Sequence, residues 1–188
     1  MRINRTLIAF LAAALVAAPA MAGAQAPGGS KSDPKGTLAE SDRKFVMEAA
    51  RGGVAEVELG KLAGERASND AVKQFGQRMV TDHGKANEEL KELAQQKKLT
   101  LPTGLDSKHR KLHDRLSKLS GAEFDRAYVE EMVKDHRKDV TDFRREAERA
   151  RDADLKTWAG KTLPTLEDHL KQVQSLQAQV KASRGTTR

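Results

Sequence analysis

Residues 129–147 decide the fold class of this chain; they read Val-Glu-Glu-Met-Val-Lys-Asp-His-Arg-Lys-Asp-Val-Thr-Asp-Phe-Arg-Arg-Glu-Ala. Apolar side chains, with one histidine among them, recur at spacings of three and four residues: Val129, Met132, His136, Val140, Phe143 and Ala147. This spacing places them on one face of an α-helix, and the charged residues between them fall on the opposite face. The stretch therefore predicts an amphipathic helix with one buried stripe.

The same periodicity continues in both directions along the chain. It predicts four long helices, at about 38–67, 69–98, 122–150 and 153–182. Pro164 lies inside the last of them and is expected to kink it. Cysteine is absent, so packing alone has to stabilise the fold.

Helix-capping residues precede each predicted start. Thr37 and Ser120 each begin an S/T-x-x-E capping box. Ser68 and Asp152 are favourable N-caps for the other two helices.

The connection between the second and third helices is much longer than a turn. It runs from Leu99 to Gly121 and contains a short amphipathic helix at about 106–119. About 14 helical residues and about 8 extended ones reach ~45 Å, which is the length of a 30-residue helix. The connector can therefore cross the whole bundle and leave those two helices parallel. We expect an all-α fold, a ferritin-like four-helix bundle with a long crossover that contains a short helix.

The first 24 residues predict a cleavable signal peptide. Arg2 and Arg5 precede an unbroken apolar run at 6–18, and small residues at 20–24 offer A-x-A cleavage sites. The run is shorter than the roughly 20 residues that span a bilayer, and no later stretch is apolar for long enough. We expect a soluble periplasmic or secreted protein, with a disordered linker at 25–36 and the bundle domain at 37–183.

Composition excludes several function classes. The formal net charge is +7, but basic residues alternate with acids, as on solvated helix faces, and aromatic residues make up only 4%. Nucleic-acid binding is therefore not expected, while a weak attraction to acidic envelope surfaces is. No phosphate-binding glycine motif occurs, and no serine is placed as an activated nucleophile, so nucleotide-dependent and serine-based catalysis have no support.

Three histidines occupy core positions of their stripes, near the middle of three helices: His83, His136 and His169. Glu56, on the first helix, lies at about the same height. Neutral imidazole and carboxylate are ligands for zinc, copper, iron or manganese, and the preceding Asp82, Asp135 and Asp168 would support them from a second layer. The alternative is that these histidines are structural, held by hydrogen bonds that fix the helix register.

The di-iron chemistry of ferritin-like proteins is not expected. Those sites use Glu-x-x-His on two helices. Here the residues three positions before the histidines are Val80, Val133 and Leu166.

Several motifs together resemble the bacterial domain of unknown function 4142. They are Gly52-Gly53-Val54-Ala55-Glu56-Val57-Glu58-Leu59-Gly60-Lys61-Leu62-Ala63, the repeated Met-Val-x-Asp-His at 79–83 and 132–136, Phe124-Asp125-x-x-Tyr128-Val129, and Leu163-Pro164-x-Leu166-x-x-His169. The resemblance covers about residues 38–180 and implies a ferritin-like fold and an export signal. It implies no established activity.

Three functions remain open at this point. An enzyme is one of them, supported only by analogy with ferritin-like proteins. An envelope-binding or stress-protective bundle requires only export, solubility and a filled core. A metal-binding or metal-buffering periplasmic protein would use Glu56, His83, His136 and His169.

Overall fold

The computed structural model describes residues 38–182. The predicted signal peptide and linker, at 1–24 and 25–36, lie outside these residues. Within them the chain forms five helices and no strand: α1 (Glu40–Arg66), α2 (Asp70–Gln96), α3 (Ser107–Leu116), α4 (Gly121–Arg149) and α5 (Ala153–Ala182). The all-α class is confirmed.

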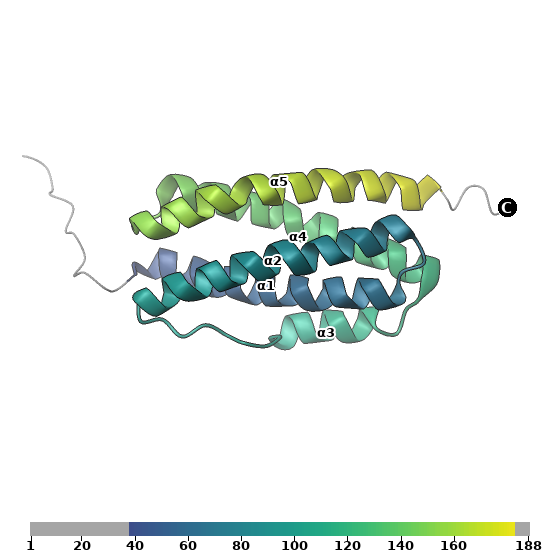
Figure 1. Ribbon diagram of the computed structural model, residues 1–188, viewed down its shortest axis with the longest axis horizontal. Coiled ribbons are helices and arrows are strands. Elements are labelled where there is room, and N and C mark those ends of the chain that lie inside the picture. Colours follow the sequence, from purple (N-terminus) through teal and green to yellow (C-terminus); the bar gives the residue numbers. More distant parts are fainter. Residues whose placement is uncertain (1–37, 183–188) are drawn as a thin grey trace, which may run out of the picture. The chain divides into compact units, whose positions relative to one another are not determined.

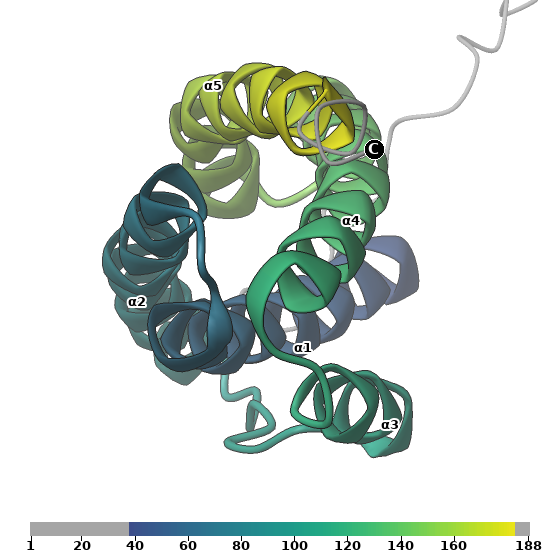
Figure 2. The same ribbon diagram turned by 90° about the vertical axis from the view of Figure 1, so that its right-hand side faces the viewer.

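The four long helices form two antiparallel hairpins that face each other (Figure 1). α1 packs along α2, and α4 packs along α5, while α1 also contacts α4 and α2 contacts α5. The view along the bundle shows these helices around one core, with α3 outside it against α1 and α4 (Figure 2). The crossover that contains α3 returns the chain along the bundle, so α2 and α4 run in the same direction (Figure 1).

Each hairpin turn is held by an aspartate from the other hairpin. Asp125, near the start of α4, accepts hydrogen bonds from the backbone N–H groups of Ser68 and Asn69, at 3.1 and 3.0 Å. Asp42, near the start of α1, accepts from the backbone N–H groups of Arg151 and Asp152, both at 2.9 Å. Both aspartates are buried. The turn at each end of the bundle is therefore held by the same kind of contact.

The predicted N-caps are partly right. Asp152 accepts from the backbone N–H of Leu155 at 3.0 Å, as expected of a cap. Ser68 is wrong by one residue, because its hydroxyl donates to Asp125 and Asn69 caps α2 instead. Ser120 occupies the N-cap position of α4, but its side chain makes no capping hydrogen bond.

The core consists of two hydrophobic clusters. One cluster includes Leu59, Met79, Val133 and Val173, and the other includes Ala50, Leu90, Val140 and Leu166. On each long helix the change from one cluster to the other takes place across a buried polar residue, which is Glu56, His83, His136 or His169. The core therefore contains one polar layer at about mid-height.

None of the helices within residues 38–182 combines the length and the apolar character needed to cross a membrane.

Candidate metal centre

Each long helix contributes one side chain to the polar layer: Glu56 from α1, His83 from α2, His136 from α4 and His169 from α5. Glu56, His136 and His169 have an exposed fraction of 0%, and His83 has 7%. All four occupy stripe positions that neighbouring turns fill with apolar residues. Helix packing therefore turns them inward.

The three imidazoles form one compact group. One ring nitrogen from each histidine lies within 4.8 Å of the corresponding nitrogens of the other two. The ring centroids are 5.3 Å apart for His136 and His169, 5.5 Å for His83 and His169, and 5.7 Å for His83 and His136. Nitrogens around a tetrahedral zinc ion lie about 3.3 Å apart, so binding would require the group to contract by only about 1.5 Å.

Asp82 determines which nitrogen of His169 keeps a free lone pair. The Nε2 atom of His169 lies 2.7 Å from Oδ2 of Asp82. A carboxylate can only accept a hydrogen bond, so Nε2 carries the proton and Nδ1 has the free lone pair. Nδ1 is buried and has no hydrogen-bond partner.

A backbone carbonyl fixes the tautomer of His136 in the same way. Its Nδ1 donates to the carbonyl oxygen of Met132, one turn earlier, at 3.0 Å. The lone pair then lies on Nε2, which is also buried without a partner. Metal-binding histidines usually donate their other N–H to a carboxylate or a backbone carbonyl, and these two histidines show one of each.

His83 completes the group with a buried Nε2 that has no partner. Burial lowers the pKa of all three histidines, most strongly that of His83. For His136 the pKa falls to about 4. All three imidazoles are therefore neutral at pH 7, which is the form that binds metal.

Glu56 lies behind His136. Its Oε1 atom is 3.7 Å from Nδ1 of His136, whereas the free lone pair of that histidine is on Nε2. Burial, and secondly the nearby Asp135, raise the pKa of Glu56 well above its ordinary value. Glu56 is therefore placed beside His136, while the convergent nitrogens come from the histidines alone.

The three aspartates that precede the histidines have different contacts. Asp82 contacts His169 on the neighbouring helix, and Asp135 lies near Glu56. Asp168 pairs with Arg78 at 2.9 Å instead.

Arg78 is a residue of the site that sequence reasoning missed. Its guanidinium donates to Asp82 and Asp168, and also to Gln172 at 2.8 Å, so it joins α2 to α5 beside His169. The signal available in the sequence was the Arg78–Asp82 spacing of four residues, which allows an ion pair on one helix.

The remaining two histidines lie apart, on α3. The cationic residues around them favour a surface position for both, but His109 is buried and its Nδ1 lies 3.0 Å from Asp106. The inner face of α3 packs on the bundle, which explains this burial. His113 is only partly buried, with Nδ1 at 3.8 Å from Asp114.

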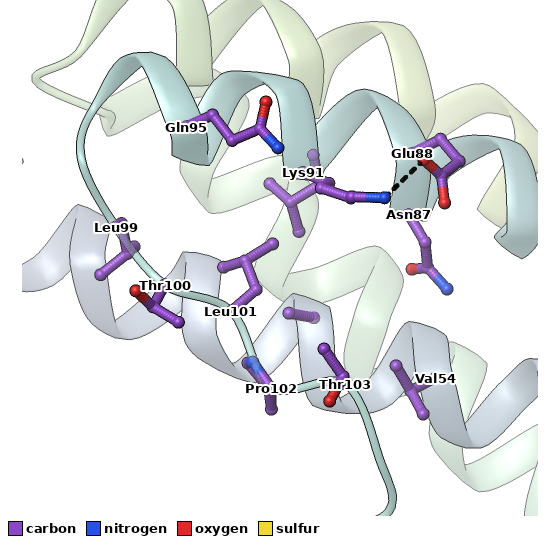
Figure 3. A pocket seen from close by; sticks show the side chains of 12 residues that line it. Val54, Asn87, Glu88, Lys91, Gln95, Leu99, Thr100, Leu101, Pro102 and Thr103 are labelled. Atoms are coloured by element: carbon purple, nitrogen blue, oxygen red, sulfur yellow. Dashed lines mark hydrogen bonds and ion pairs between the residues drawn. The ribbon is translucent and has the colours of Figure 1, made fainter.

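A hollow of about 480 Å³ lies between α1, α2 and the crossover (Figure 3). Val54, Leu101 and Pro102 line it, and an ion pair of Lys91 and Glu88 borders it at 3.2 Å. The three clustered histidines are not among its lining residues, so it is separate from the candidate metal centre.

Comparison with known proteins gives a family match and a fold match. The profile of a family described as "Domain of unknown function (DUF4142)" matches residues 27–176. No curated protein matches the sequence. The predicted relation to ferritin-like proteins stays a prediction.

Three solved structures have similar folds at low sequence identity. A DUF305 fragment from Deinococcus radiodurans is 12% identical, with a TM-score of 0.66 over 76% of this chain and 99% of that chain. A DUF305 protein from Streptomyces coelicolor, described as secreted, is 15% identical, with a TM-score of 0.64 over 75% and 92%. CopM in its Cu(II)-bound form is 17% identical, with a TM-score of 0.62 over 73% and 96%.

Proposed function

We propose that this chain, which belongs to the DUF4142 family of unknown function, binds a transition-metal ion through His83, His136 and His169. Two observations carry the proposal: one ring nitrogen from each of three buried histidines converges on the same place, and each of these histidines has a buried ring nitrogen without a hydrogen-bond partner. Glu56 and Asp82 would act from behind the ligands, on His136 and His169.

The structural alternative explains fewer of these contacts. A histidine that only fixes helix register needs its polar atoms satisfied, because a buried group without a partner costs about 1–3 kcal/mol. Here the outward nitrogens of His136 and His169 have partners, but the inward nitrogens do not. A metal ion would satisfy all three inward nitrogens at once.

The donor set favours copper or zinc. Imidazole suits zinc, copper, iron and nickel, whereas manganese prefers carboxylate and water oxygens. The fold is similar to that of CopM, which has been solved with Cu(II) and with Cu(I) bound. Copper is therefore the first ion to test and zinc the second.

The proposed location of this activity is outside the cytoplasm. It rests on the signal-peptide pattern in residues 1–24. A protein with a buried three-histidine site and no indicated reaction would store or buffer the ion there. The envelope-binding or stress-protective role would instead need no metal.

Metal analysis and thermal unfolding of untagged protein test the proposal. Purified protein should contain copper or zinc, and adding either ion to the metal-free form should raise the melting temperature. An ion at about 100 times its Kd stabilises the folded state by about 2.7 kcal/mol. This rise should vanish in His83→Gln, His136→Gln and His169→Gln.

His113→Gln is the matched control, because His113 lies on α3 and outside the cluster. It should retain the full metal-dependent rise. If wild-type protein contains no metal and its melting temperature is unchanged by both ions, the histidines are structural and the proposal is wrong.

A further inference from the structure

A small hollow of about 130 Å³ opens between α2 and α5, next to the histidine group. Its lining includes Asp82, Ala86 and Glu89 from α2 and Lys161, Thr162 and Thr165 from α5. Asp82 thus borders the hollow and also accepts the hydrogen bond from His169. Asp82 therefore connects the hollow to one of the candidate ligands.

Two other sides of the bundle have additional or close packing. α3 packs against both α1 and α4, on the opposite side of the bundle from α5 (Figure 2). Within the first hairpin, Gly60 and Gly76 bring the backbones of α1 and α2 into close contact. His83, on α2, has an exposed fraction of 7%.

Two ion pairs cross the seam between α2 and α5. Arg78 pairs with Asp168 at 2.9 Å, and Lys161 pairs with Glu89 at 2.8 Å. The side chains are 28% to 63% exposed. Pairs of this kind contribute about 0–1 kcal/mol, so they can break without unfolding the bundle.

Pro164 weakens α5 beside the same hollow. It lies inside the helix, between Thr162 and Thr165 of the lining. Proline has no N–H, so the carbonyl of Gly160 loses its helical hydrogen bond. This part of α5 can therefore move more easily than an uninterrupted helix.

We propose that the metal ion enters and leaves the histidine group through the hollow between α2 and α5, with Asp82 as the carboxylate that leads from the hollow to His169. The inference rests on the proposed function, since it concerns the same site. Opening requires the Lys161–Glu89 pair to separate and α5 to move at Pro164. The ion then passes from Asp82 to the free nitrogens of the three histidines.

Metal exchange kinetics test this route with a variant that fills the hollow. In Thr165→Trp, both the association rate of Cu(II) and its dissociation rate into a chelator should fall by about tenfold, which adds about 1.4 kcal/mol to each barrier. The Kd should stay unchanged, because the ligands are intact. Thr141→Trp is the matched control, since Thr141 is an exposed residue on α4 and should leave both rates unchanged.

A second variant opens the route and does not add bulk to the bundle. Lys161→Gln removes the pair with Glu89 and should raise both rates without changing the Kd. Its control is Arg144→Gln, which removes an ion pair with Glu167 between α4 and α5. Unchanged rates in both Thr165→Trp and Lys161→Gln would overturn the route while leaving metal binding established. Wild-type protein that binds no metal would instead contradict the proposed function itself.

Discussion

Oδ2 of Asp82 on α2 accepts a hydrogen bond from Nε2 of His169 on α5, across the seam between the two hairpins. Asp82 immediately precedes His83, yet it contacts the histidine of another helix. Successive residues on an α-helix point about 100° apart, so an aspartate cannot face the same direction as the histidine next to it. When His83 points into the core, Asp82 points towards α5. Asp82, which is bonded along the chain to His83 and by a hydrogen bond to His169, therefore links two of the three candidate ligands.

Asp82→Asn should weaken metal binding by about 10- to 100-fold, which is the usual cost of losing a residue that orients a metal ligand. The amide can present its NH₂ group to Nε2 and thereby favour the wrong tautomer of His169. Asp168→Asn is the control, because Asp168 also pairs with Arg78 but does not touch an imidazole. The Kd from competition with a chelator measures both. Equal losses in the two variants would mean that the negative charge matters and the orientation of His169 does not.

Gly60→Ala should destabilise the fold by about 1–3 kcal/mol, as overpacking usually does. A Cβ atom at Gly60 would lie 2.5 Å from the carbonyl oxygen of Gly76, a backbone atom that cannot turn away. Gly64→Ala, one turn further along α1, meets nothing within 4 Å. It should stabilise the protein by up to about 1 kcal/mol through helix propensity. If α1 and α2 are in contact at Gly60, denaturant unfolding should show a lower free energy of unfolding for Gly60→Ala and a higher one for Gly64→Ala.

Stability should also depend on the protonation of Glu146. This side chain is buried, and burial together with Asp42 raises its pKa from 4.5 to about 7. Below pH 4.5 both the folded and the unfolded state hold the proton, so Glu146 adds no pH dependence there. Between pH 4.5 and 7 the unfolded state releases it first, so rising pH lowers the free energy of unfolding. Well above pH 7 the loss is complete, at about 3 kcal/mol, because each pKa unit between 4.5 and 7 corresponds to about 1.4 kcal/mol.

Glu146→Gln cannot ionise, so it should be more stable than wild type at pH 8, and this advantage should disappear near pH 4.5. Denaturant unfolding at the two pH values measures the difference. Glu148→Gln, at an exposed position on the same helix, is the control and should show no such change. An equal difference from wild type at both pH values would show that Glu146 does not titrate as described.

The sequence predicted the helices well and the site contacts only in part. The three-and-four spacing of apolar residues placed both ends of every long helix within two residues of the structure. The same spacing indicated that His83, His136 and His169 point inward. The stripes did not show that Asp82 would bind His169, because that contact depends on how two separate helices pack.

The buried aspartates at the helix starts could not be recognised from sequence either. Asp42 and Asp125 read as ordinary acidic residues in a first or second helical turn, where solvent-exposed carboxylates are common. Their role depends on a turn from the other hairpin lying beside them, which only the packed bundle provides. The distance between each aspartate and the turn of the other hairpin cannot be read from a single sequence.

Asp42 and Asp125 should contribute to stability independently, because they hold turns at opposite ends of the bundle (Figure 1). Asp125→Ala leaves the backbone N–H groups of Ser68 and Asn69 without this acceptor, and it should cost about 2–4 kcal/mol. Asp42→Ala should cost a similar amount for the same reason. Asp70→Ala is the control: its carboxylate is exposed and makes only an ion pair with Lys73 at 3.6 Å, so the loss should be at most about 0.5 kcal/mol.

The double variant Asp42→Ala/Asp125→Ala tests whether the two ends act separately. Sites without shared partners usually have additive effects within about 0.5 kcal/mol. The double variant should therefore lose the sum of the two single losses, measured by denaturant unfolding with an unchanged m-value. A loss well below the sum would mean that freeing one turn already loosens the other end. In that case the bundle ends would be coupled through the polar layer, and metal binding at the histidines should then restore part of the lost stability.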